Sequence, residues 1–135
     1  MMFVIHRDGV PTYDGGCGQL VYLTTTIERL VELGIRPIFT DRNATIAYAE
    51  VTNELTRLDD LVDWELMAAT WWNNTDAEPD RKERRMAECL VHRRVPWHAF
   101  QEVSAQSPAC ARRAQEILSS VGVEATVAVR PAWYY

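Results

Sequence analysis

The spacing of apolar residues changes several times along the chain, and these changes predict a mixture of strands and helices. Residues 19–26 are β-branched and aromatic, as is typical of a strand, and a short apolar run at 36–41 predicts a second, buried strand. Apolar residues recur at helical spacing in 43–55 and again in 58–72, which predicts two helices. Acidic residues open the second of these segments, where the helix dipole favours negative charge.

Two further helices are predicted from residues that cap helix ends. Thr26 can cap a helix that ends at Gly34, and Ser107 can cap a longer helix that ends at Gly122. Polar, turn-forming residues at 72–80 predict a loop, which is called the polar loop below.

The remaining segments are short, and strands and helices do not follow one another in a strict rhythm. We expect a basic turn and a strand in 81–92, a helical turn and a strand in 95–107, and a last strand in 123–135. This mixture favours an α+β domain with a largely antiparallel or mixed sheet over a doubly wound fold. Since the sequence shows no repeat, linker or low-complexity segment, a single domain over residues 1–135 is expected.

The composition argues against several classes of protein. The net charge is −5 at pH 7, whereas a generic nucleic-acid coat protein is strongly basic. Cys17, Cys89 and Cys110 are widely separated, and no histidine has a metal-ligand spacing to another, so neither a metal site nor a disulfide framework is expected. Neither a signal peptide nor a membrane-spanning run is visible. We therefore expect a cytoplasmic protein without a metal and without a membrane partner.

The charges are distributed unevenly around the polar loop. Residues 50–80 contain nine acids and one base, whereas residues 81–94 contain six bases and two acids. The basic block is compatible with a solvated helix face and also with an anion-binding patch. Trp71 and Trp72 cannot both point inward from a regular element, so one of them is expected at the surface. An exposed indole beside cations suits an unpaired base, which stacks on the ring while its phosphate meets the charge.

Glu88 is an acid inside an apolar run, and burial of a carboxylate is costly unless it is paired or hydrogen-bonded. In a strand, Glu88 would share its face with Met86 and Leu90. One interpretation is an ion pair with Arg84 or Arg85. The other is a catalytic carboxylate on a rigid strand, preceded by a substrate-reading loop. Such a carboxylate can bind a ribose hydroxyl and stabilise an oxocarbenium ion at the sugar.

Four segments occur together in a distinctive order: FTDRNA (39–44), LDDLVDWELM (58–67), the stretch from WWNN to VPW (71–97) and the closing PAWYY (131–135). With this order and spacing, nearly the whole chain resembles the DarT family of DNA ADP-ribosyltransferase toxins. The resemblance implies a split, mostly antiparallel sheet around an NAD cleft. It also implies NAD-dependent transfer of ADP-ribose onto a base of single-stranded DNA, with thymine favoured by the closer motif match, and release of nicotinamide.

The resemblance also implies roles for individual residues. Glu88 matches the family's catalytic glutamate, and the polar loop matches the segment that recognises the base. Cys89 replaces the usual phenylalanine after the glutamate and is expected to point away from it. Taken with the aromatic and basic pattern, the expected DNA-binding residues are Asn43, Trp71, Trp72, Arg81, Lys82 and Arg85.

Known members are toxins that a partner antitoxin with a macrodomain neutralises. They carry a long N-terminal portion with the main NAD-binding residues and an arginine that cooperates with the glutamate. MMFVIHRDG (1–9) matches a stretch inside the family domain, so an N-terminally truncated domain is expected, with the main NAD residues upstream. The alternative is a catalytically inactive module that binds single-stranded DNA or the antitoxin.

Overall fold

The computed structural model describes residues 12–13 and 15–134, so the segment 1–9 that was matched to the family interior lies outside the described residues. The chain divides into two compact units. The first unit comprises Met1–Arg29 and Pro96–Tyr135, and the second comprises Leu30–Val95. Each unit holds a three-stranded sheet within the described part of the chain. The expectation of a single domain over 1–135 stays a prediction.

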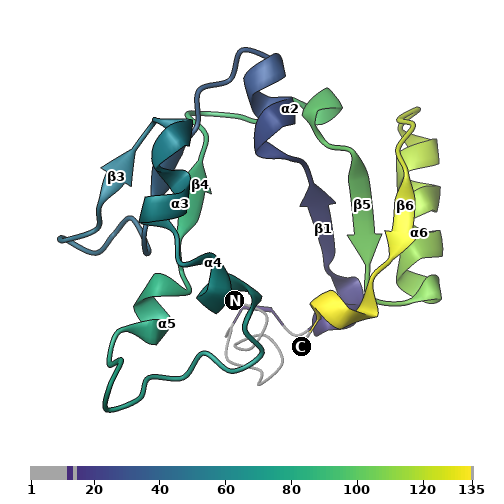
Figure 1. Ribbon diagram of the computed structural model, residues 1–135. Coiled ribbons are helices and arrows are strands. Elements are labelled where there is room, and N and C mark those ends of the chain that lie inside the picture. The colour runs from purple at the N-terminus through teal and green to yellow at the C-terminus, as the bar shows by residue number, and fades with distance from the viewer. Residues whose placement is uncertain (1–11, 14, 135) are drawn as a thin grey trace. The chain divides into compact units, whose positions relative to one another are not determined.

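The sheet of the first unit is mixed. β1 (Val21–Thr24) pairs antiparallel with β5 (Glu102–Ala105), which pairs in parallel with β6 (Val127–Val129). The crossover between the two parallel strands is the helix α6 (Pro108–Ser120), which packs against both of them (Figure 1). The hydroxyl of Ser107 accepts the Cys110 N–H at 3.3 Å and caps this helix, as predicted.

Tyr134 anchors the end of the chain to this sheet. Its hydroxyl donates to the carbonyl of Ser104 at 2.7 Å and to that of Leu20 at 3.1 Å, and its ring packs edge-on against Tyr22. Burial raises the pKa of Tyr134 to about 12. Short 3₁₀ helices complete the unit: η1 (Cys17–Gln19), η3 (Trp97–Ala99) and η4 (Pro131–Trp133).

The sheet of the second unit is antiparallel. β2 (Ile38–Thr40) is its middle strand and pairs with β3 (Val51–Thr52) and with β4 (Glu88–Leu90). In this register Thr40 lies opposite Glu88. Three of the four strand pairings in the two sheets are therefore antiparallel, and the expected α+β fold with mostly antiparallel pairing is confirmed.

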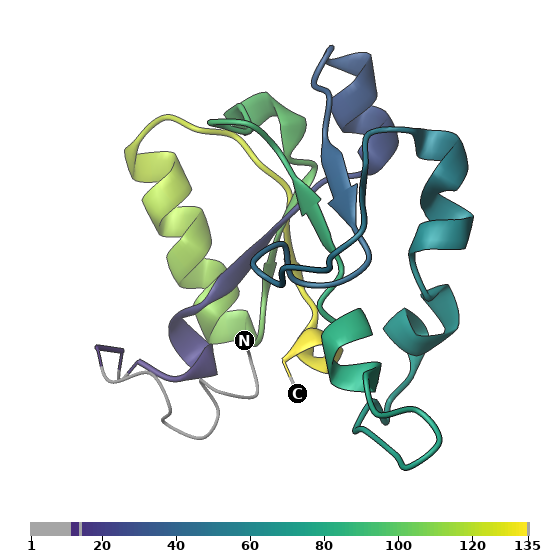
Figure 2. The same ribbon diagram turned by 90° about the vertical axis from the view of Figure 1, so that its left-hand side faces the viewer.

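Short helices connect the strands of the second unit. They are η2 (Leu55–Arg57), α3 (Leu58–Leu61), α4 (Trp64–Ala68) and α5 (Arg81–Arg84). The polar loop runs between α4 and α5 and extends away from the sheet of its unit (Figure 2). No helix in the described ranges is long and apolar enough to cross a membrane.

The helix α2 (Ile27–Glu32) contains the boundary between the units. Thr26 caps it as predicted, since its hydroxyl accepts the Arg29 N–H at 3.1 Å. The chain leaves the helix through Gly34, which has a φ of +72°. A positive φ is adopted readily only by glycine, so the predicted end of this helix is confirmed.

Two predicted helices are wrong in part or in whole. Residues 43–55 form turns and then β3 instead of a helix, because Asp41 closes the segment through its bond to the Glu50 N–H at 2.8 Å and β3 pairs with β2. Residues 58–72 form two short helices, because Asp63 interrupts the first and caps the second by accepting the Leu66 N–H at 2.9 Å. Both errors arise where a side chain bonds to backbone and competes with a continuous helix.

Candidate active site around Glu88

Glu88 is the first residue of β4, and its backbone is fixed by the neighbouring strand. The Glu88 N–H donates to the hydroxyl of Thr40 at 3.2 Å. That hydroxyl in turn donates to the carbonyl of Arg42 at 2.6 Å, and Thr40 is only 1% exposed. Met86, by contrast, lies before the strand, so only Leu90 shares the strand face with Glu88.

The carboxylate of Glu88 is held by the segment that follows β2, residues 41–50, called the Glu88 loop below. One carboxylate oxygen accepts the side-chain N–H of Asn43 at 3.3 Å, and the other accepts the backbone N–H of Ala44 at 3.0 Å. Asn43 is itself fixed, because its side-chain oxygen accepts the Thr45 N–H at 2.9 Å. Since each carboxylate oxygen can accept more than one hydrogen bond, the group is oriented but still able to bind a ligand hydroxyl.

An ion pair between Glu88 and Arg84 or Arg85 was one of the two sequence interpretations, and it is wrong. Within the described residues, no arginine forms an ion pair with Glu88. Arg84 instead pairs with three other acids, and Arg85 donates to the carbonyl of Met67. Neutral amide donors therefore satisfy the half-buried carboxylate of Glu88, and no cation of the described residues pairs with it.

The Glu88 loop is tied to α5 by Arg42. Its guanidinium donates to Asp41 at 2.8 Å and to Glu83 of α5 at 3.2 Å, and it lies 4.9 Å from the ring centre of Tyr48. The Tyr48 hydroxyl donates to the same oxygen of Glu83 at 2.6 Å. The bond to Asp41 raises the pKa of Arg42, and the bond to Glu83 raises the pKa of Tyr48.

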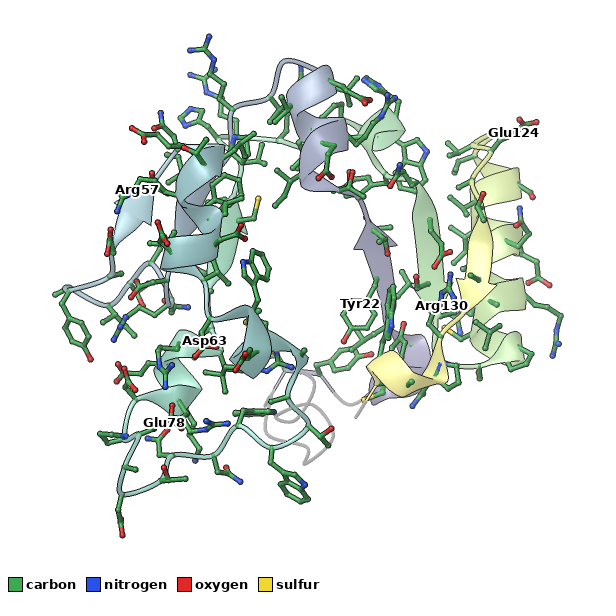
Figure 3. The ribbon with its side chains drawn as sticks, in the orientation of Figure 1. Tyr22, Arg57, Asp63, Glu78, Glu124 and Arg130 are labelled. Atoms are coloured by element: carbon green, nitrogen blue, oxygen red, sulfur yellow. The ribbon has the colours of Figure 1, made fainter. Side chains whose placement is uncertain are left out.

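The polar loop is shaped by two arginines of α5 that meet Glu78. Arg81 donates to Glu78 at 2.6 Å and to the carbonyl of Trp71 at 3.0 Å. Arg84 donates to Glu78 at 2.7 Å and also pairs with Asp63, which lies at the start of α4 (Figure 3). The hydrogen bonds from Arg84 and Arg81 lower the pKa of Glu78.

Side chains and backbone close the polar loop further. The carboxamide oxygen of Asn74 accepts the Lys82 N–H at 2.8 Å, so the beginning of the loop is bonded to α5. The Thr75 N–H donates to the Glu78 carbonyl at 3.0 Å, and the Thr75 hydroxyl accepts the Glu78 N–H at 3.1 Å. The loop is thus an ordered turn held at both of its ends.

The side chains expected to bind DNA fall into two groups. Trp71 is 79% exposed, while Trp72 is half-buried, as expected if one of the pair lies at the surface. Lys82 is exposed, and its ammonium group makes no ion pair with any described residue. The side chains of Arg81, Arg85 and Asn43 are engaged within the protein.

Sequence reasoning missed Thr40, Arg42 and Ala44 as residues of this site. Thr40 and Arg42 stand in FTDRNA, where Thr40 ends β2 and polar residues follow directly, and that position was the available signal. Ala44 acts through its backbone, so its side chain carries no signal. Among described residues, no group of three or more histidine, cysteine, aspartate or glutamate side chains is placed to hold a metal ion.

A separate apolar groove of about 360 Å³ lies in the first unit, lined by β1 and α6. Val21, Leu23, Trp97, Ile117 and Leu118 are among its lining residues. Among the described residues, its lining contains no carboxylate and no histidine that could act as a general acid or base. Glu88 and its loop thus form the better candidate for chemistry.

Comparison with known proteins shows which family this chain resembles. A family model described as "ssDNA thymidine ADP-ribosyltransferase, DarT" matches residues 1–135. A DNA ADP-ribosyl transferase of Mycobacterium tuberculosis (strain ATCC 25618 / H37Rv) is 30% identical over 135 residues, which cover all of this chain and 58% of that protein. A DNA ADP-ribosyl transferase of Thermus sp. (strain 2.9) is 28% identical over 137 residues and is covered to 63%. The chain therefore spans about three fifths of the length of these relatives.

Solved structures show the same fold. Thermus sp. 2.9 DarT in complex with NAD+ superposes with a TM-score of 0.89 at 26% identity, over 99% of this chain and 66% of that one. The same protein in complex with ADP-ribosylated single-stranded DNA gives a TM-score of 0.88 at 26% identity, over 99% of this chain and 63% of that one. The arrangement of strands and helices described above is thus that of an NAD-binding protein and of a protein bound to modified DNA.

Proposed function

This chain belongs to the DarT family of single-stranded DNA ADP-ribosyltransferases, and from that premise we propose that it carries the catalytic glutamate and the base-reading loop of such an enzyme. The resemblance inferred from its motifs is confirmed by the family match over residues 1–135. We propose NAD as the co-substrate and thymine in single-stranded DNA as the acceptor. The chain spans 58% of the M. tuberculosis relative. That these 135 residues transfer ADP-ribose is therefore also proposed.

The fixed orientation of Glu88 is the observation that carries the proposal. Two N–H donors of the Glu88 loop hold its carboxylate on a strand that is itself paired in a sheet. A charge held in this way needs no rearrangement when positive charge develops beside it, and such preorganisation is a major source of catalysis. Glu88 would bind a ribose hydroxyl of NAD and stabilise the oxocarbenium character of the ribose carbon.

The reaction that this site would support is a substitution at that carbon. The bond to the nicotinamide nitrogen breaks, and its electron pair leaves with nicotinamide. A ring nitrogen of thymine supplies the electron pair of the new bond and releases its proton to water; in a thymidine only one ring nitrogen is not already bonded to sugar. We propose that this chain contributes the carboxylate and the reading of the base to that reaction.

Recognition of the base is assigned to Trp71 and Lys82. An indole that is 79% exposed at the start of the polar loop offers a face for an unpaired base, and the free ammonium group of Lys82 offers a charge for a phosphate. Arg81 and Arg85 were expected to contact DNA directly, but their bonds to Trp71 and Met67 favour a role in shaping the loop. Trp72 and Asn43 stay predicted contacts.

The biological setting follows from the family resemblance. We propose that the complete protein acts in the cytoplasm as the toxin of a toxin–antitoxin pair, and that its partner is an antitoxin with a macrodomain. A neighbouring gene that encodes a macrodomain would support this setting. Co-expression of that gene should relieve growth inhibition by the toxin.

A second candidate function is a non-catalytic module that binds single-stranded DNA or the antitoxin. The match to only 58% of the M. tuberculosis relative is the observation that favours it, and the polar loop and Glu88 lie within the matched part. Loss of one side of a cleft removes the positioning on which much of the rate depends. This module would bind DNA without modifying it.

One experiment separates the two functions. The chain, and a version extended by sequence encoded upstream of Met1, are incubated with NAD+ and single-stranded oligonucleotides that contain or lack thymine. Mass spectrometry then detects an ADP-ribose adduct, and Glu88→Gln serves as the matched control with the same shape and no charge. An adduct on thymine-containing DNA that disappears in the control supports the enzyme. An adduct that persists undiminished in Glu88→Gln excludes the role given to Glu88, and an adduct from the extended version alone supports the module.

A further inference from the structure

Arg42 lies in the Glu88 loop, and its side chain bonds to Glu83 of α5, the helix that directly follows the polar loop. We propose that Arg42 is a positioning residue that couples the Glu88 loop to the polar loop, so that ordering of the base-reading segment and orientation of the glutamate depend on each other. This inference rests on the proposed function for its catalytic meaning. Its structural content can be tested without any activity.

On the side of the Glu88 loop, the backbone of Arg42 belongs to the support of the glutamate. Its carbonyl accepts the Thr40 hydroxyl at 2.6 Å, and the same hydroxyl accepts the Glu88 N–H at 3.2 Å. The next two residues are Asn43 and Ala44, which hold the carboxylate. Any displacement of the Arg42 backbone therefore moves the donors of Glu88 with it.

On the side of the polar loop, the guanidinium of Arg42 reaches Glu83 at 3.2 Å. Glu83 lies in α5 between Arg81 and Arg84, which both bond to Glu78 of the polar loop. A continuous series of bonds thus runs from the carboxylate of Glu88 to the turn that precedes α5. Coupling between two sites needs such a connected set of groups, although connection alone does not establish it.

The contacts around Arg42 hold its side chain in the position that joins the Glu88 loop to α5. Its side chain is 13% exposed and lies between two acids, Asp41 and Glu83, which share the one guanidinium. The Tyr48 hydroxyl donates to the Glu83 oxygen that Arg42 also contacts, and the Tyr48 ring lies against the guanidinium. A planar guanidinium can bond in two directions at once, whereas the ammonium of a lysine acts as a point charge. Arg42→Lys is therefore expected to keep the charge and lose most of the coupling.

Amide hydrogen exchange measured by NMR tests the link in the protein alone. The Ala44 N–H, bonded to Glu88, reports on the Glu88 loop, and the Lys82 N–H, bonded to Asn74, reports on the polar loop. Arg42→Gln should speed exchange at both amides by about fivefold, the effect of losing one net hydrogen bond. Glu83→Ala, made in α5, should speed exchange at Ala44 in the native background. Its effect there should be smaller when Arg42→Gln is already present, because only the bond from Tyr48 to Glu83 then remains to be lost.

The controls separate coupling from general destabilisation. Arg130→Gln removes an arginine–glutamate pair of the first unit and should leave both amides unchanged. Circular dichroism verifies that each variant is folded, and Glu83→Ala decides the matter if Arg42→Gln does not fold. Unchanged exchange at Ala44 in Glu83→Ala, or equal effects of Glu83→Ala in both backgrounds, would overturn the proposal.

Activity gives the second arm of the test. In the version of the protein that transfers ADP-ribose, Arg42→Gln should lower kcat by about fivefold and change the KM for NAD+ much less, because the lost interaction positions a group and does not bind that substrate. A change confined to KM would contradict the positioning role. If no version of the wild-type protein transfers ADP-ribose, the proposed function fails, and the exchange measurements still decide whether Arg42 couples the two loops.

Discussion

The side-chain nitrogen of Asn43 lies 3.3 Å from a carboxylate oxygen of Glu88, although the two residues are 45 positions apart in the sequence. The register of β2 and β4 brings them together, since Thr40 faces Glu88 and Asn43 follows three residues later. The adjacent Ala44 N–H occupies the other oxygen. A single loop thus sets the orientation of the carboxylate to which we assign the chemistry.

Loss of the Asn43 donor should impair this orientation. Asn43→Ala is expected to lower the rate of ADP-ribose transfer by about tenfold, and Asn43→Asp by more, because it places a second negative charge against Glu88. The rate is measured from adduct formation on a thymine-containing oligonucleotide. Asn53→Ala, an exposed asparagine of the same unit, is the matched control and should have native activity. A native rate for Asn43→Asp would contradict the contact as a functional one.

Binding of single-stranded DNA should depend on Trp71 and Lys82. Trp71→Ala should weaken binding by about 1–3 kcal/mol, and Trp71→Tyr should restore part of it, since stacking needs only an aromatic face. Lys82→Glu should weaken binding and reduce the dependence on salt, because one phosphate contact is lost. Fluorescence titration at several salt concentrations measures both effects. Arg112→Glu, an equal charge reversal at an exposed position of α6, is the control, and an identical loss in this variant would exclude a local role for Lys82.

Arg84 should contribute more to stability than a typical surface arginine. It pairs with Asp63, Glu78 and Asp80, and its side chain is 24% exposed. Arg84→Ala should lower the free energy of unfolding by about 2 kcal/mol, since three carboxylates lose their common partner. Arg57→Ala, which breaks the exposed pair with Glu50, should cost less than about 1 kcal/mol. Urea denaturation compares the two, and equal losses would show that the cluster adds nothing beyond an isolated pair.

The same cluster makes stability depend on acid pH. The pKa of Glu78 is lowered from its ordinary value of 4.5 by hydrogen bonds from Arg84 and Arg81, so its ionised form is favoured in the folded protein. The stabilisation is therefore complete above pH 4.5 and is lost as the pH falls through the lower folded pKa. Carbon-detected NMR titration of Glu78 should show a pKa that rises in Arg84→Ala. An unchanged pKa would rule out Arg84 as its main cause.

Tyr134 should make the stability of the folded protein fall as the pH rises into the alkaline range. Burial raises its pKa to about 12, so the neutral phenol is favoured in the folded protein. Its contribution to stability is present below the ordinary tyrosine value of 10.0 and is lost as the pH rises toward 12. Ultraviolet titration of Tyr134→Phe should lack a late-ionising tyrosine that the native protein has, while Tyr48, whose pKa is also raised, is retained in both proteins. Tyr134→Phe should also cost about 1 kcal/mol, because the carbonyls of Ser104 and Leu20 lose a donor.

Local signals in the sequence predicted the elements whose ends are set by neighbouring residues. Ser107 and Thr26 cap their helices through bonds to residues three positions later, and Gly34 supplies the left-handed turn that ends α2. The segment 43–55 was predicted wrongly, because its conformation depends on the contact with Glu88 and on pairing of β3 with β2. Hydrophobic spacing records only the neighbours along a helix and contains nothing about such distant partners.

The difference between local and distant contacts also explains which residues of the site could be predicted from the sequence. Glu88 was identified as unusual because an acid in an apolar run is visible in the sequence, and the exposure of one tryptophan of the pair followed from geometry. The partners of the acid were not predicted: arginines four and three positions before it were the obvious candidates, and the structure uses amides from another strand's end. Proximity in sequence is a poor guide where a sheet brings distant segments together.

One of the two hydrogen bonds that orient the Glu88 carboxylate comes from the backbone N–H of Ala44. Every amino acid except proline provides this group, so position 44 is free to vary during evolution while the contact is retained. The asparagine at 43 has no such freedom, because its donor is in the side chain. Two adjacent positions that hold the same carboxylate are thus under unequal selection, and an exchange at position 44 to any residue other than proline carries no information about whether the glutamate of a related protein is still held.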